Sequence, residues 1–105
     1  MLDVREPEEF AVSHLPGAVL VADFERDIER LRGKKVIAYC TIGYRSGEYA
    51  AKLREEGIDA LNLRGSILSW THAGYPVVNQ AGETKRIHVY GKTWDLAPAG
   101  YETVW

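Results

Sequence analysis

Short apolar runs alternate along the chain with stretches of helical periodicity. Strands are predicted at the four clearest apolar runs, residues 2–4, 18–21, 36–39 and 60–63. Helices are predicted where apolar spacing or helix-start signals favour them, at residues 7–12, 24–31, 47–56 and 65–73. Strands that alternate with helices indicate an α/β protein with a parallel central sheet and helices on both faces.

The clearest strand, residues 36–39, is short and nearly all apolar. This composition is typical of a central parallel strand that is covered on both faces. The strand runs directly into Cys40. Ligands of open α/β sheets bind beyond the carboxyl ends of the strands, so Cys40 occupies a position where chemistry is expected.

Short polar residues mark the expected starts of two helices. Asp23 is predicted to cap the helix at 24–31, and Ser46 the helix at 47–56, because such side chains satisfy the free N–H groups of a first turn. Gly57 is placed to end the second of these helices.

The last part of the chain differs from the rest. It is punctuated by glycines and Pro98, and it carries the aromatic residues Trp94, Tyr101 and Trp105. We predict a domain over residues 1–78 and a C-terminal extension over 79–105 that packs on the same domain. In our hypothesis residues 86–90 add a strand to the sheet edge, which would otherwise invite pairing with another chain, and the aromatic side chains cover exposed core.

Composition excludes several classes of partner. The chain has 105 residues, enough for one domain, with 46% hydrophobic and 27% charged residues and a net charge of −2. We therefore expect neither a nucleic-acid nor a membrane partner, since no basic surface or long apolar run is visible. No signal peptide is visible and a single cysteine forms no internal disulfide, so a cytoplasmic protein is predicted.

The candidate site follows the central strand. Backbone N–H groups at a turn that leads into a helix have no internal partner, so they can form a cradle for an anion. Arg45 adds a permanent positive charge, and both effects favour a thiolate with a lowered pKa at Cys40. The predicted nucleophile is Cys40, and the predicted binding loop follows it: Thr41, Ile42, Gly43, Tyr44, Arg45 and Ser46.

Plainer interpretations of these residues stay open. A lone cysteine is often just a small buried apolar residue. One cysteine and scattered histidines give no ligand pair at zinc spacing, so we expect no metal and no cofactor. We interpret His14, His72 and His88 as structural or surface residues.

Three ordered segments resemble the rhodanese (thiosulfate sulfurtransferase) homology domain. The resemblance covers Leu2 to about residue 78. The segments are Asp3-Val4-Arg5-Glu6-Pro7-Glu8-Glu9-Phe10 with His14-Leu15-Pro16-Gly17-Ala18, Tyr39-Cys40-Thr41-Ile42-Gly43-Tyr44-Arg45-Ser46, and Leu63-Arg64-Gly65-Ser66-Ile67-Leu68-Ser69-Trp70 with Gly74-Tyr75-Pro76-Val77.

The resemblance implies a sulfurtransferase. Cys40 would take the outer sulfur of a small anionic donor such as thiosulfate as a persulfide, and an external thiol, cyanide or a protein would accept it. Arg45 would help to bind the donor, while Asp3 and Arg5 would brace the loop. Related dual-specificity phosphatases have a loop one residue longer than the six residues from Cys40 to Arg45, which favours sulfur over phosphate chemistry. A non-catalytic interaction or regulatory module is the main alternative.

The chain also departs from the family pattern. Ser13 and Ser66 stand where the family usually has glycine. The family domain normally has a strand and a helix before the Asp3 motif, so we expect a sheet shortened at the N-terminal side and a monomer or weak dimer.

Overall fold

A four-stranded parallel sheet forms the centre of the molecule. The computed structural model describes residues 1–31 and 33–105. The strand order is β2-β1-β3-β4, and all three neighbouring pairs are parallel. The bounds are β1 Leu2–Asp3, β2 Val19–Leu20, β3 Val36–Tyr39 and β4 Ala60–Asn62. The predicted α/β fold with a parallel central sheet is confirmed.

Five α-helices connect or follow these strands in the described part of the chain. They are α1 Pro7–Val12, α2 Val21–Arg26, α3 Ile28–Leu31, α4 Tyr44–Glu55 and α5 Ser66–His72. The predicted helix at 24–31 is therefore two helices, and the prediction that Asp23 caps it is wrong. The first helix begins earlier because Val21 and Phe24, three residues apart, both pack on the core.

The prediction that Ser46 caps the following helix is also wrong. Helix α4 begins at Tyr44, after Gly43, whose φ of 116° lies in the left-handed region. Such a φ is natural for glycine, and it turns the chain sharply enough for the helix to start before Ser46. Ser46 lies in the first turn, fully buried, with its hydroxyl group directed to other partners.

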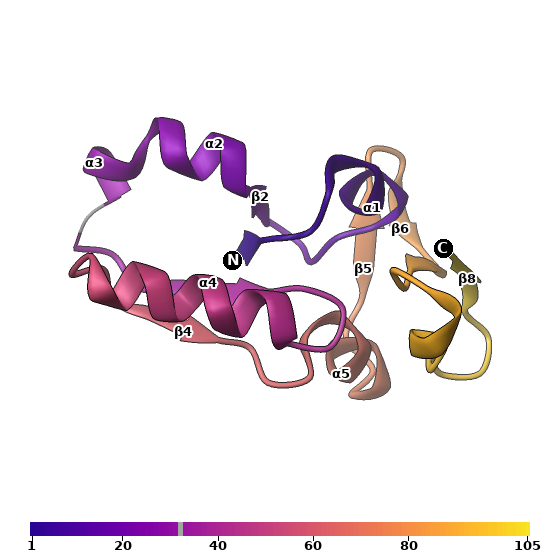
Figure 1. Ribbon diagram of the computed structural model, residues 1–105. Coiled ribbons are helices and arrows are strands. Elements are labelled where there is room, and N and C mark those ends of the chain that lie inside the picture. Colours follow the sequence, from indigo (N-terminus) through magenta and orange to yellow (C-terminus); the bar gives the residue numbers. More distant parts are fainter. Residues whose placement is uncertain (32) are drawn as a thin grey trace.

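Side chains on the two faces of the sheet form two separate apolar clusters. In β3, Val36 and Ala38 belong to one cluster and Tyr39 to the other, as the alternation of a strand requires. Helices α2, α3 and α4 cover the first face. Helix α5 covers the second together with the C-terminal strands (Figure 1).

Residues 80–105, called here the C-terminal segment, belong to a layer of short strands and one turn of 3₁₀ helix. The elements are β5 Val77–Asn79, β6 Gly82–Thr84, β7 Arg86–His88, η1 Lys92–Trp94 and β8 Glu102–Val104. Strand β5 pairs antiparallel with β6, and β7 pairs parallel with β8. Figure 1 shows this layer beside α1, at the opposite end of the molecule from α3.

The hypothesis that residues 86–90 extend the sheet edge is wrong. Strand β7 pairs with β8 instead, and it packs on the sheet face through Ile87 and Val89, both fully buried. Burial of these side chains in the cluster that contains Tyr39 favours this position, because it removes apolar area from water. Trp94 and Tyr101 pack partly against this cluster, whereas Trp105 is 56% exposed.

Candidate active site

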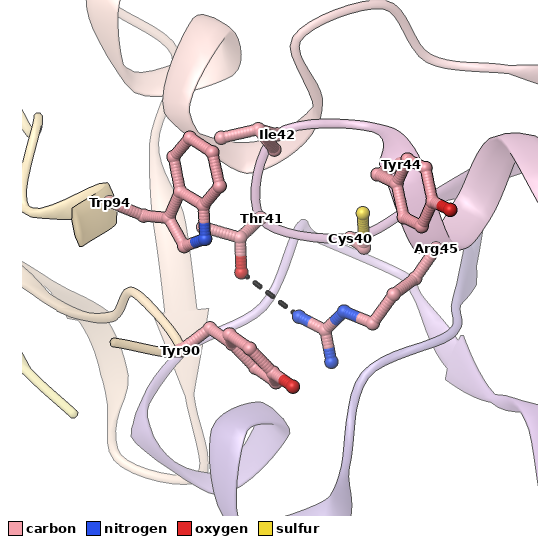
Figure 2. Close-up of a pocket in the computed structure, with 7 residues that line it drawn as sticks. All are labelled: Cys40, Thr41, Ile42, Tyr44, Arg45, Tyr90 and Trp94. Atoms are coloured by element: carbon pink, nitrogen blue, oxygen red, sulfur yellow. Dashed lines mark hydrogen bonds between the residues drawn. The ribbon is translucent and has the colours of Figure 1, made fainter. Parts of the chain in front are cut away.

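Cys40 directly follows β3 at the carboxyl edge of the sheet. The residue is 1% exposed, and it lines a cavity of about 220 Å³ (Figure 2). The N–H group of Gly43 donates a hydrogen bond to the Cys40 Sγ atom over 3.1 Å. The left-handed backbone of Gly43 lets the loop fold back so that this N–H reaches the sulfur.

A hydroxyl network surrounds the same sulfur atom. The Ser46 Oγ atom lies 3.4 Å from Cys40 Sγ and 2.6 Å from Asn62 Oδ1. A hydroxyl group has one proton, so Ser46 can donate to the sulfur or to Asn62 but not to both. When Cys40 is a neutral thiol, we expect the Ser46 hydroxyl group to donate its proton to Asn62 Oδ1. When Cys40 is a thiolate, its negative charge attracts the same proton to the sulfur.

Ser66 holds the backbone of Cys40. The Cys40 N–H donates to Ser66 Oγ over 3.0 Å, and the Ser66 hydroxyl donates to the Leu63 carbonyl over 3.1 Å. Ser66 has a φ of 49°, a left-handed conformation that costs a non-glycine residue free energy. At this departure from the family pattern, the serine side chain therefore supplies a contact that glycine lacks.

The local electrostatics favour the thiolate form of Cys40. Burial alone raises the pKa of the Cys40 thiol. Hydrogen bonds from the Ser46 hydroxyl, the Ser46 N–H and the Gly43 N–H, together with the Arg45 charge, outweigh burial, so the pKa is lowered overall. A lowered pKa is the condition for a reactive cysteine at neutral pH.

Arg45 reaches over the cavity from the first turn of α4, but its charge is already paired. Its guanidinium group forms an ion pair with Glu9 at 3.0 Å and donates to Thr41 Oγ1 over 3.1 Å. It also lies 4.4 Å from the centroid of the Tyr90 ring. Glu9 is 2% exposed and also accepts the Glu6 N–H, so α1 holds the arginine in a fixed position.

Asp3 and Arg5 form a buried ion pair beside β3, not in the loop itself. Both side chains are fully buried, and Arg5 Nη2 lies 2.7 Å from Asp3 Oδ2. Asp3 also accepts the Tyr39 hydroxyl over 2.7 Å, and Arg5 donates to the Ser13 carbonyl over 2.7 Å. Tyr39 precedes Cys40, so these contacts are linked to the candidate nucleophile through the end of its strand. A bracing role for the pair stays a prediction.

Seven residues line the cavity, and two of them come from the C-terminal segment. The predicted loop contributes Thr41, Ile42, Tyr44 and Arg45, and the segment contributes Tyr90 and Trp94. Sequence reasoning missed both aromatic residues as site residues. The cavity lining does not include His14, which stacks on Phe10.

The described residues contain no cluster of the side chains that most often bind metal ions. Within residues 1–31 and 33–105, no group of three or more His, Cys, Asp or Glu side chains could hold one. Across the same ranges, no helix is long and apolar enough to cross a membrane.

A thiol at the carboxyl edge of a parallel sheet, beside a loop of backbone donors, defines an α/β protein with a cysteine-centred candidate site. Comparison with known proteins identifies the family. The family profile described as "Rhodanese-like domain" matches residues 1–73. The chain belongs to the rhodanese-like domain family.

Individual relatives agree with this assignment. A protein named "Sulfurtransferase" from Allochromatium vinosum is 34% identical over 86 residues, covering 78% of this chain and 80% of the relative. An uncharacterized protein of Synechocystis is 34% identical over 82 residues, covering 74% of this chain but only 46% of the relative. The chain thus spans less than half of that protein.

Comparison with solved structures gives the same assignment. The crystal structure of a rhodanese-related protein from Thermoplasma volcanium superposes with a TM-score of 0.64 at 32% identity. The match covers 73% of this chain and 80% of that chain.

Proposed function

We propose that the protein is a sulfurtransferase that moves a sulfane sulfur through a persulfide on Cys40. The Cys40 thiolate attacks the outer sulfur of a donor such as thiosulfate and forms a new S–S bond. The donor's own S–S bond breaks, and sulfite leaves with the bonding electron pair. An external thiolate or cyanide then attacks the outer persulfide sulfur, which restores the Cys40 thiolate.

One observation carries this proposal: the Cys40 sulfur lies at an open cavity and accepts the Gly43 N–H in a chain of the rhodanese-like family. Further donors are free nearby. Within residues 1–31 and 33–105, the loop N–H groups of Thr41, Ile42, Tyr44 and Arg45 have no protein partner. Unpaired N–H groups of this kind suit a persulfide anion.

Arg45 has a limited role in this proposal. Its charge lowers the Cys40 pKa and stabilises anions in the cavity. Because Glu9 already pairs with it, Arg45 offers a donor less attraction than a free guanidinium would. Arg45→Ala should still weaken the use of anionic donors, because the remaining positive charge is lost, but less than the loss of a free guanidinium would; unchanged donor kinetics would remove Arg45 from this role.

Turnover with thiosulfate and cyanide tests the whole cycle. The expected product is thiocyanate, formed by the wild-type protein and not by Cys40→Ser. If neither protein forms thiocyanate and no donor transfers sulfur to the wild-type protein, a non-catalytic interaction module replaces the proposal.

A further inference from the structure

We propose that the C-terminal segment selects sulfur compounds with an aromatic or similarly apolar carbon body over inorganic thiosulfate. This inference rests on the proposed function and names the substrate class for the same cavity. The selecting side chains are Tyr90 and Trp94. Both lie outside residues 1–73, the range that the family profile matches.

The cavity is larger and more apolar than a small inorganic anion needs. Its volume is about 220 Å³. An apolar protein cavity of about 150 Å³ already holds a benzene ring. Four of the seven lining residues are aromatic or aliphatic: Ile42, Tyr44, Tyr90 and Trp94.

These side chains line the same cavity as Cys40. In Figure 2 the Trp94 indole and the Tyr44 ring lie on opposite sides of the view, with the Cys40 sulfur between them. Aromatic rings prefer offset or edge-to-face contact with another ring, and such pairs add affinity beyond simple burial. A ring attached to the reacting sulfur would find these partners while the sulfur faces Cys40.

The charge in the cavity does not compensate an inorganic dianion well. Arg45 is the one cationic lining residue, and a buried carboxylate, Glu9, already neutralises it. The Tyr90 ring covers the guanidinium group at 4.4 Å. An inorganic dianion would lose its hydration for a paired charge, whereas an organic anion would also gain apolar contacts.

The backbone of Tyr90 supports a dedicated role for its side chain. Tyr90 has a φ of 76°, a rare conformation for a bulky residue, and its N–H donates to His88 Nδ1 over 3.1 Å. Backbone strain of this kind concentrates at functional sites. Here the strained backbone holds the Tyr90 ring over Arg45, although Tyr90 is 58% exposed.

The substrate class has a simple balanced reaction. The Cys40 thiolate attacks the outer sulfur of an arylthiosulfonate anion and forms the persulfide anion. The sulfur–sulfur bond of the donor breaks, and an arylsulfinate leaves with the electron pair. No proton, oxidant or reductant is needed.

Two donors with the same reactive sulfur test the inference. Benzenethiosulfonate carries a phenyl ring and thiosulfate does not. The two donors differ in intrinsic reactivity. The decisive quantity is therefore how a variant changes the selectivity ratio, which is the kcat/KM for benzenethiosulfonate divided by the kcat/KM for thiosulfate. In Trp94→Ala this ratio should fall about tenfold, the scale of a lost ring contact with its buried area.

Trp105→Ala is the matched control. It removes the same side chain from the same segment, where it is 56% exposed and does not line the cavity. The ratio in this variant should equal that of the wild type. Should Trp94→Ala unfold, Tyr90→Asn replaces it, because asparagine tolerates a positive φ. This variant removes a ring and uncovers Arg45, so the ratio should again fall.

A binding measurement separates this inference from the proposed function. Cys40→Ser is titrated with benzenesulfonate and with methanesulfonate, which share a charged head and lack a transferable sulfur. Tighter binding of benzenesulfonate, lost on adding Trp94→Ala, supports aromatic selection even if no donor transfers sulfur. A ratio that changes by less than about twofold in the variants that fold, or equal binding of the two sulfonates, overturns the inference.

Discussion

The sheet region, residues 1–73, and the C-terminal segment contribute to one cavity in different ways. The sheet region supplies Cys40 and its hydrogen-bond donors, held by a parallel sheet and a buried ion pair. The C-terminal segment supplies two aromatic walls, Tyr90 from the bend after β7 and Trp94 from the 3₁₀ turn. Our two proposals therefore assign sulfur chemistry to the region that matches the family and substrate selection to the region that does not.

The two regions also differ in what holds them. Buried polar contacts join Asp3, Arg5 and Tyr39 within the sheet region. The C-terminal segment is attached mainly by apolar burial of Ile87 and Val89. Single substitutions in each region can measure separately how much the buried polar contacts and the apolar burial contribute to the free energy of unfolding.

The largest effect is expected in the sheet region, from Asp3→Asn. This change leaves the Arg5 guanidinium buried without a counter-charge, which costs about 3–5 kcal/mol of unfolding free energy. Urea unfolding followed by circular dichroism measures it. The control is Asp23→Asn, in an exposed ion pair with Arg26, where less than about 1 kcal/mol should be lost. Equal losses would contradict a structural role for the buried pair.

A similar loss is expected in the C-terminal segment, from Ile87→Ala. The side chain is fully buried, and its truncation leaves a cavity that costs about 2–5 kcal/mol. Leu96→Ala, at a residue that is 57% exposed, should cost less than about 0.5 kcal/mol. If both variants unfold at the wild-type urea concentration, the segment does not belong to the cooperative fold.

A smaller effect is expected from Ser46→Ala, which removes a donor to the sulfur. The alkylation rate of wild-type Cys40 should reach half its maximum at a lower pH than the rate of a free thiol does, because its pKa is lowered. In Ser46→Ala the pKa should rise, and the rate at neutral pH should fall about fivefold. Ser69→Ala, at an exposed serine, is the control. Identical pH profiles for Ser46→Ala and the wild type would contradict the role of Ser46.

The same pKa shift links folding to pH. The folded-state pKa of Cys40 lies below the unfolded one, so the folded state binds fewer protons between the two values. The contribution of Cys40 ionisation to the free energy of unfolding is complete above the pKa of Cys40 in the unfolded state. This contribution is lost as the pH falls through the pKa of Cys40 in the folded state. In Cys40→Ser this part of the pH dependence should be absent.

Sequence patterns predicted the parts of the site that are local in the chain. An apolar strand that runs into Cys40 and a following glycine turn correctly predicted that Cys40 lies at the carboxyl edge of the sheet. The helix start was predicted too late because the left-handed turn at Gly43 replaces a side-chain cap. The contact of Asn62 with Ser46 was not predicted, although the sequence offered a signal for it. Asn62 ends the strand next to β3, and neighbouring parallel strands end at the same edge of the sheet.

Other parts of the site depend on contacts between distant residues. Glu9 meets Arg45 from 36 positions away, and Tyr90 and Trp94 reach the cavity from beyond the sheet region. No local periodicity encodes such contacts. Tyr90 and Trp94 reach the cavity because β7 pairs with β8 and buries Ile87, with Val89 after it, instead of joining the sheet edge.

Intact mass of the protein after incubation with a sulfane-sulfur donor tests the central claim most directly. Wild-type protein treated with thiosulfate or benzenethiosulfonate should gain the mass of one sulfur atom, which a thiol reductant then removes. Cys40→Ser should gain nothing under the same conditions. A wild-type protein without the added sulfur, or a Cys40→Ser protein that carries it, would contradict sulfur transfer through Cys40.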